Sequence, residues 1–166
     1  MDDSDEIDPT VGDDSGTGTD SEAVPPEAAA LLQQFIEREH GYLSWLNTRV
    51  DSIERGRVVM SIPYDEKLTN TTSPPTIHGG VAATLIDTVG GVAQRSTFDD
   101  PTQGGVATVN LNVNYLRRAS GDLTATAEVV RAGGSIGVSE ITVESPTPDG
   151  GTEAVATGQA AYRLFR

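Results

Sequence analysis

A short segment of the chain combines an acidic side chain with an open helix start. Residues 76–93 read TIHGGVAATLIDTVGGVA, where His78 precedes two glycines and Asp87 stands nine positions after the histidine. Glycines at a helix N-terminus leave backbone N–H groups exposed, and the helix dipole favours developing negative charge there. These features are typical of an oxyanion hole, and a carboxylate such as Asp87 is a candidate general base or nucleophile beside it.

Asp87 also has a purely structural interpretation. Aspartate is almost never fully buried without a partner, so a carboxylate satisfied by hydrogen bonds or lying at an interface would also explain this position. The sequence leaves both interpretations open, although the neighbouring glycines and histidine favour a role in chemistry.

The spacing between the helix start and Asp87 limits how one helix could use both. Gly79 and Asp87 are eight residues apart, which corresponds to about 12 Å along a helix axis. Reacting groups must come within about 3–3.5 Å of the atoms on which they act. Two antiparallel helices from two protomers could meet this condition. If both features are catalytic, we therefore predict that the site lies at a homodimer interface.

A buried helix should carry this segment, over about 79–95. Its apolar residues surround the helix axis, and a helix that is apolar all round is typically buried. Its glycines disfavour helix formation, so a close approach by another element or a ligand is the expected reason for them.

One helix and two strands are predicted before the buried helix. The pattern of apolar residues is helical from Pro25–Pro26 and fades near His40. Residues 42–64 suggest two strands that turn at Glu54–Gly56, and residues 65–76 form a polar loop containing two prolines.

Four more strands are predicted after the buried helix. Residues 104–116 alternate in polarity, residues 121–145 form two strands around Gly133–Gly134, and residues 152–165 form a last one. Short turns between consecutive strands imply an antiparallel sheet, with the central helix in its concave face. We therefore predict an α+β domain with one long helix wrapped by a curved antiparallel sheet, plus an extra N-terminal helix. On the strand over 104–116, one face should carry Val109, Leu111, Val113 and Tyr115, and the other Thr108, Asn110, Asn112 and Asn114.

Composition argues against several kinds of site. The 166 residues contain no cysteine, so thiol nucleophiles and thiolate metal ligands are ruled out. With only His40 and His78 as histidines, a zinc or iron site is not expected. No apolar run approaches the roughly 20 residues that span a bilayer, and the acidic N-terminus does not resemble a secretory signal. We expect a cytoplasmic protein without a membrane partner.

The charge is strongly acidic, with 25 acidic and 11 basic residues. Residues 1–24 are rich in Asp, Ser, Thr and Gly, so we predict a disordered acidic tail there and a folded domain over 25–166. Lys67 is the only lysine. This composition indicates either adaptation to high salt, where screening reduces self-repulsion, or simply an acidic protein. Nucleic acid is a poor partner for such a surface.

Several motifs resemble those of a known family. The segment HGGVAATLID is similar to that of hotdog-fold acyl-CoA thioesterases of the phenylacetic-acid-degradation (PaaI) type. The similarity runs from about Asn70 to Phe165, through VNLNVNYL, GDLTATAEVVRAG and ATGQAAYRLF. The resemblance implies a hotdog fold and hydrolysis of an acyl-CoA thioester without a metal or redox cofactor. It also implies a homodimer, or a tetramer formed from two dimers.

The resemblance also implies roles for individual residues. Asp87 matches the catalytic acid, either as general base for water or as nucleophile on the thioester carbonyl. Gly79 matches the residue whose backbone N–H polarises that carbonyl, and Thr108 matches a hydroxyl that positions the carboxylate or the water. His78 matches the family histidine, which either caps the helix and fixes the loop or contacts the leaving sulfur.

Two regions depart from the family pattern. Asn70 matches a polar residue that touches the thioester, but the loop after it is two residues longer than usual, so Thr72 competes for this role. Relatives often read Arg-Pro and Gly-Arg where this chain has Arg117–Arg118 and Gly133–Gly134. Arginines suit the phosphates of coenzyme A, although the sequence favours a solvated surface charge for each of them. The candidate coenzyme A contacts are Arg117, Arg118, Arg131, Gly133 and Ser135, with Gly134 at the position of the missing arginine.

Two other functions remain open. A hotdog dehydratase acting on hydroxyacyl thioesters needs a paired histidine and carboxylate on one substrate carbon, and the distance between His78 and Asp87 argues against it. A protein that binds acyl-CoA without hydrolysing it could keep the same fold. Loss of hydrolysis with retained coenzyme A binding in Asp87→Asn would separate a thioesterase from such a binder.

Overall fold

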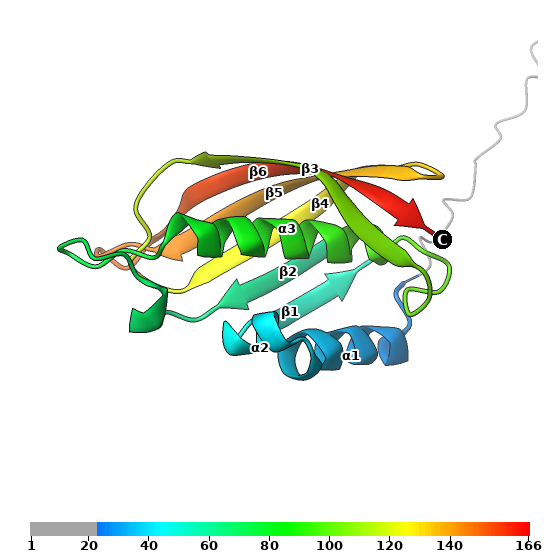
Figure 1. The fold of residues 1–166 in the computed structure, drawn as a ribbon, viewed down its shortest axis with the longest axis horizontal. Coiled ribbons are helices and arrows are strands. Elements are labelled where there is room, and N and C mark those ends of the chain that lie inside the picture. Colours follow the sequence, from blue (N-terminus) through cyan, green and yellow to red (C-terminus); the bar gives the residue numbers. More distant parts are fainter. Residues whose placement is uncertain (1–22) are drawn as a thin grey trace, which may run out of the picture.

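A curved sheet encloses the long helix α3, Gly79–Arg95, in a computed structural model that describes residues 23–166 (Figure 1). The sheet has six strands in the order β1-β2-β4-β5-β6-β3, and all neighbouring strands are antiparallel. This arrangement confirms the predicted α+β architecture. The predicted tail lies outside the described residues except for Ala23 and Val24. Within the described part, no helix is long and apolar enough to cross a bilayer.

The strands follow the predicted turns closely. The turn at Glu54–Gly56 separates the first two strands, and Gly56 has a positive φ of 78°, which glycine adopts without strain. The glycine pairs at 133–134 and 150–151 lie between later strands. The strand bounds are β1 Arg49–Glu54, β2 Arg57–Ile62, β3 Gly105–Tyr115, β4 Leu123–Ala132, β5 Ile136–Pro146 and β6 Thr152–Phe165.

The N-terminal region is more helical than the sequence predicts. It forms α1 (Pro26–Gln34), a π-helical turn η1 (Phe35–Glu39) and α2 (Gly41–Trp45). The prediction that the first strand includes residues 42–45 is wrong. The backbone of His40 is extended, and its ring Nδ1 accepts the Leu43 N–H at 3.4 Å, so the chain starts a new helix there.

The core lies between α3 and the concave face of the sheet. Leu85, Ile86 and Val89 are fully buried on the helix. The prediction that α3 is buried on every side is only partly right, because a stripe of α3 that includes Asp87 remains half-buried. Strands β2, β4, β5 and β6 supply the opposite side of the core with the inward-facing residues Val58, Met60, Ile62, Leu123, Ala125, Ala127, Ile141, Val143, Ala156, Ala160 and Tyr162.

Strand β3 departs from the predicted alternation. Thr108 and Tyr115 are seven residues apart, so a regular strand would point them to opposite faces. Both instead bond to α3, Thr108 to Asp87 and Tyr115 to Gly79. The register with β6 shifts between Thr108 and Asn110, which marks a β-bulge at Val109 and reverses the alternation. The predicted placement of Thr108 opposite the face of Tyr115 is therefore wrong.

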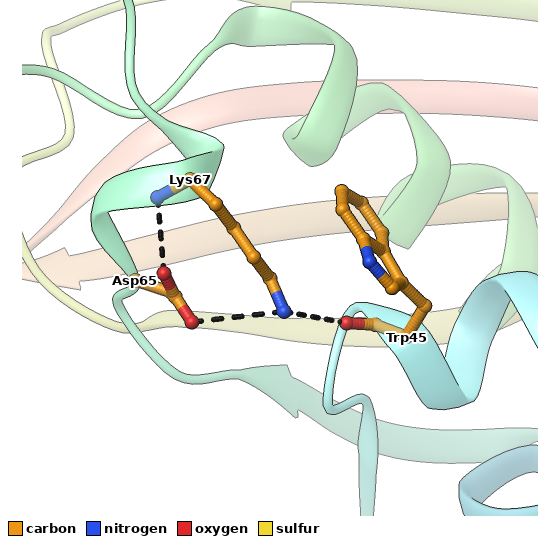
Figure 2. A network of polar contacts seen from close by, with 3 residues as sticks. All are labelled: Trp45, Asp65 and Lys67. Carbon is orange, nitrogen blue, oxygen red and sulfur yellow. Dashed lines mark hydrogen bonds and ion pairs between the residues drawn. The ribbon is translucent and has the colours of Figure 1, made fainter.

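The loop before α3 is anchored to the N-terminal helices. It contains a short 3₁₀ turn, η2 (Glu66–Leu68), whose Lys67 reaches across to α2 (Figure 2). The Lys67 Nζ donates to the Trp45 carbonyl at 2.8 Å, lies 4.6 Å from the centre of the Trp45 ring and 3.6 Å from Asp65 Oδ2. These contacts hold the start of the loop that leads to α3.

Candidate active site

The N-terminus of α3 is built around the side chain of His78. His78 is the N-cap residue, and its Nδ1 accepts the Gly80 N–H at 2.9 Å. Because Nδ1 is used as an acceptor, only Nε2 of this ring can donate to another group. Within residues 23–166, the Gly79 N–H is left without an acceptor. The helix therefore presents one free backbone donor at its positive end.

Tyr115 explains why residue 79 is a glycine. Its hydroxyl donates to the Gly79 carbonyl at 2.9 Å. A Cβ atom at Gly79 would lie 3.0 Å from the Tyr115 ring, closer than side-chain carbons normally approach. The expected close approach by another element is thus made by β3, and it fixes the first turn of the helix beside the strand end.

A cleft of about 310 Å³ opens at this helix end, and we call it the helix-start cleft. Asn70 and Thr72 both line it, but the Thr72 hydroxyl is already engaged with the Pro74 carbonyl and the Thr76 hydroxyl. The Asn70 side chain has no hydrogen-bond partner among the described residues. The other lining residues that the sequence singles out are His78, Gly79, Arg117 and Arg118.

Asp87 lies in the middle of α3 with its carboxylate held at one oxygen. The Thr108 hydroxyl donates to Asp87 Oδ1 at 2.7 Å. The backbone carbonyl of Asp87 accepts the buried Tyr162 hydroxyl at 3.0 Å. Burial raises the pKa of Tyr162 above its ordinary value of 10.0, and the charge of Asp87 adds to this effect. Thr108 is thus brought to Asp87, as the resemblance implies.

A second cleft of about 240 Å³ adjoins Asp87, and we call it the Asp87 cleft. Asp87 and Thr108 line it together with apolar residues of α3, β3 and the N-terminal helices. It shares no lining residue with the helix-start cleft. One chain therefore holds the free Gly79 donor and the Asp87 carboxylate in two separate clefts, more than two turns of α3 apart.

The candidate coenzyme A residues lie in two places. Arg117 lines the helix-start cleft, where its guanidinium pairs with Glu153 at 2.8 Å. Arg131 lies near the end of β4, Gly133 and Ser135 lie in the β4–β5 turn, and none of the three lines either cleft. That turn is near the C-terminal end of α3, because Gln94 Nε2 donates to the Arg131 carbonyl at 3.3 Å. The structure does not bring the two groups together within one chain.

Tyr115 and Tyr162 are the residues that sequence reasoning missed. Tyr115 is visible in the motif VNLNVNYL only as one of the alternating apolar residues. Tyr162 contacts Asp87 from 75 residues away, and a local sequence pattern carries no signal for such a contact. Within residues 23–166, no three His, Cys, Asp or Glu side chains are grouped to hold a metal ion.

Comparisons with known proteins assign the family. A profile of the thioesterase superfamily matches residues 75–151. The chain is 47% identical over 153 residues to a candidate esterase of Halobacterium salinarum, covering 90% of this chain and 98% of that protein. It is 30% identical over 128 residues to a candidate esterase of Saccharolobus solfataricus, covering 76% and 86%. A solved thioesterase family protein from Silicibacter pomeroyi superposes with a TM-score of 0.72 at 29% identity, over 81% of this chain and 96% of that one.

These similarities agree with the observed fold and are also found in the sequence. An identity of 47% over nearly the whole of a relative implies common descent as well as a common fold. The long helix inside its curved sheet has the arrangement of the solved thioesterase. The chain is a hotdog-fold protein that belongs to the thioesterase superfamily.

Proposed function

We propose that the protein hydrolyses an acyl-CoA thioester to a free acid and coenzyme A, as a thioesterase of the PaaI type. Asp87 acts as general base for water or as nucleophile on the thioester carbonyl. The Gly79 N–H donates to the carbonyl oxygen as negative charge develops on it. Membership of the thioesterase superfamily supports thioester hydrolysis. The assignment of Asp87 rests on one observation: Thr108 fixes its carboxylate at the wall of an apolar cleft.

The separation of the two clefts supports an active site shared between two protomers. Strand β3 is at the edge of the sheet, so its outer row of backbone N–H and C=O groups is free to pair. Its apolar side chains Val109 and Leu111 are 63% and 36% exposed. A second copy that pairs with β3 in the antiparallel sense would satisfy this edge in a symmetric dimer.

Such a dimer would complete the site. A two-fold axis between Leu111 and Asn112 would place Thr108 of one copy beside Tyr115 of the other, because positions 108 and 115 are equidistant from that point along the strand. Thr108 holds Asp87 and Tyr115 holds Gly79, so the carboxylate of one protomer would face the helix-start cleft of its partner. The dimer or a tetramer of two dimers is proposed to be the active form.

The proposed dimer also gives the candidate coenzyme A residues a common position. Antiparallel α3 helices put the C-terminal end of one helix near the N-terminal end of the other. Arg131, Gly133 and Ser135 of one protomer would then approach Arg117 and Arg118 of its partner, around the phosphates of coenzyme A. The assembled site would be a basic spot on an otherwise acidic protein.

We further propose adaptation to high salt. The formal net charge is −14, and a 47% identical relative comes from Halobacterium salinarum. Mobile ions screen repulsion among exposed charges. Enzyme assays should therefore include molar concentrations of salt.

The test of the proposed function is steady-state hydrolysis of aryl, short-chain and long-chain acyl-CoAs, followed with a thiol-trapping dye. Asp87→Asn removes the base or nucleophile but keeps the shape of the side chain. It should lower kcat by about 10²–10⁴-fold while coenzyme A binding is retained. Asp99→Asn, the same change at an exposed aspartate, should leave kcat unchanged.

Other outcomes favour the alternatives. A wild-type protein that binds acyl-CoA but releases no thiol from any substrate, with or without molar salt, would be a non-catalytic binder. Hydration or dehydration of a hydroxyacyl thioester without thiol release would identify a dehydratase. Within one chain His78 and Asp87 lie in separate clefts, but the proposed dimer would bring the partner's His78 towards Asp87, so the product of the reaction has to separate the two enzymes.

A further inference from the structure

The N-terminal helices form one wall of the Asp87 cleft. Leu32 lies on α1, Phe35 and Ile36 on η1, and Leu43 on α2, and all four line the cleft. Apart from His40, the other lining residues belong to α3, the beginning of β3 and Tyr162 of β6, and they include Val92. The candidate catalytic carboxylate and the N-terminal helices therefore line the same cleft.

Most polar side chains around this cleft form hydrogen bonds with other protein groups. The Thr88 hydroxyl donates to the Thr84 carbonyl at 2.8 Å, and the Tyr162 hydroxyl donates to the Asp87 carbonyl at 3.0 Å. Arg95 donates to the carbonyls of the loop at 101–102. His40, which also lines the cleft, accepts the Leu43 N–H with its Nδ1. Since these polar groups already have protein partners, the apolar remainder of the lining suits an apolar group.

The volume of the cleft limits what it can hold. At about 240 Å³, it is larger than the roughly 150 Å³ apolar cavity that accommodates benzene. It is smaller than the roughly 300–1,000 Å³ of pockets for complete drug-sized ligands. The cleft can take one ring or a chain of similar bulk, but not a long acyl chain and not coenzyme A as well.

We propose that the Asp87 cleft holds the acyl group of the substrate, and that Phe35 and Val92 restrict this group to a compact one. The inference rests on the proposed thioesterase function and adds the size of the acyl group to it. Thiol release measures the function, whereas the ratio of kcat/KM values between substrates measures the restriction.

Phe35 lines the cleft from η1. Its ring is 50% exposed and packs edge-on against His40, with ring centroids 5.7 Å apart. Truncation of a half-exposed ring should open the cleft towards solvent with little effect on folding. Leu31 provides a matched control, because it lies four residues earlier on α1, is 57% exposed, and does not line the Asp87 cleft.

The experiment compares kcat/KM for benzoyl-CoA, hexanoyl-CoA and palmitoyl-CoA in four proteins. The wild type should prefer benzoyl-CoA and hexanoyl-CoA to palmitoyl-CoA by at least about tenfold, the discrimination that a small difference in fit provides. Phe35→Ala should reduce this preference several-fold by admitting the long chain. Val92→Phe should fill the cleft and lower kcat/KM for benzoyl-CoA by at least about tenfold. Leu31→Ala should keep the wild-type ratios.

Contrary results would distinguish a failure of the size restriction from a failure of the proposed thioesterase function. A wild type that cleaves palmitoyl-CoA as well as benzoyl-CoA would overturn the inference and leave thioester hydrolysis intact. Unchanged ratios in both Phe35→Ala and Val92→Phe, with wild-type melting temperatures, would overturn it as well. Absence of thiol release from every substrate in the wild type would overturn the proposed function together with the inference.

Discussion

Asp87 illustrates how a carboxylate is kept on a largely buried helix. One oxygen accepts the Thr108 hydroxyl, while the backbone of the same residue accepts the Tyr162 hydroxyl. The first of these contacts is predicted from the sequence, because the resemblance to the thioesterase family implies it. The second joins positions 75 residues apart, and only the folded sheet brings them together.

Gly79 provides a direct test of the backbone donor. Proline is tolerated at the first residue of a helix, and His78 already has the extended backbone required before proline, with φ −62° and ψ 132°. Gly79→Pro should lower kcat by about 10²–10³-fold, the cost of one lost oxyanion donor. Gly79→Ala introduces the same Cβ next to Tyr115 but keeps the N–H, so it should be clearly more active. Equal activity of the two variants would exclude the Gly79 N–H from the reaction.

Tyr162 predicts a pH dependence of stability. Because its pKa is raised in the folded state, its contribution is complete below about pH 10, the value for an unfolded chain, and is lost as the pH rises further. Tyr162→Phe loses one hydrogen bond and should be less stable by about 1 kcal/mol at pH 7. The difference from wild type should shrink above about pH 10 in urea denaturation series. The exposed Tyr64→Phe serves as control; a gap that widens at high pH would contradict the prediction.

At the scale of elements, β3 shows what periodicity can and cannot predict. The strand and its approximate bounds follow from the alternation of residues 104–116. The bulge at Val109 has no signature in that alternation, because it is the pairing with β6 that shifts. The bulge nevertheless lets Thr108 and Tyr115 face the same helix, so a non-local feature determines both halves of the candidate site. The N-terminal region is comparable: the helix before His40 is readable from its pattern, but the pattern predicts strand for α2, because the start of α2 depends on the side-chain cap at His40.

Two adjacent glycines of α3 should respond differently to the same substitution. A Cβ at Gly90 would lie 2.2 Å from the Tyr162 hydroxyl, whereas a Cβ at Gly91 would lie 3.4 Å from the Tyr162 ring. Gly91→Ala should raise the free energy of unfolding by up to about 1 kcal/mol through helix propensity. Gly90→Ala should lower it by about 1–3 kcal/mol through overpacking. Chemical denaturation measures both, and similar stabilities for the two variants would argue against the tight helix–sheet contact.

At the scale of the whole molecule, the two clefts make subunit complementation a decisive experiment. Asp87→Asn and Gly79→Pro should each be nearly inactive alone. A mixed dimer would contain one doubly defective site and one intact site, if each site combines Asp87 of one protomer with Gly79 of its partner. Co-expression of both variants should then restore about a quarter of wild-type activity, since half of the dimers are mixed and half of their sites are intact.

A site confined to one chain predicts no recovery. Co-expression of Asp87→Asn with Asp99→Asn is the control. Asp99 lies outside both clefts, so the Asp99→Asn protomer should contribute as a wild-type protomer does. Light scattering on the same samples gives the mass of the assembly. Activity in a monomeric fraction would contradict the shared site.

The contacts of Lys67 have a practical consequence. It is the only lysine in the chain, and it joins α2 to the loop before α3 (Figure 2). Apart from the α-amino group, an amine-directed fluorophore therefore has a single position to label, on the segment that leads to Asn70. Labelling would replace the ammonium that bridges Trp45 and Asp65, so the rate of modification would report how often this bridge opens, with no engineered cysteine in the chain.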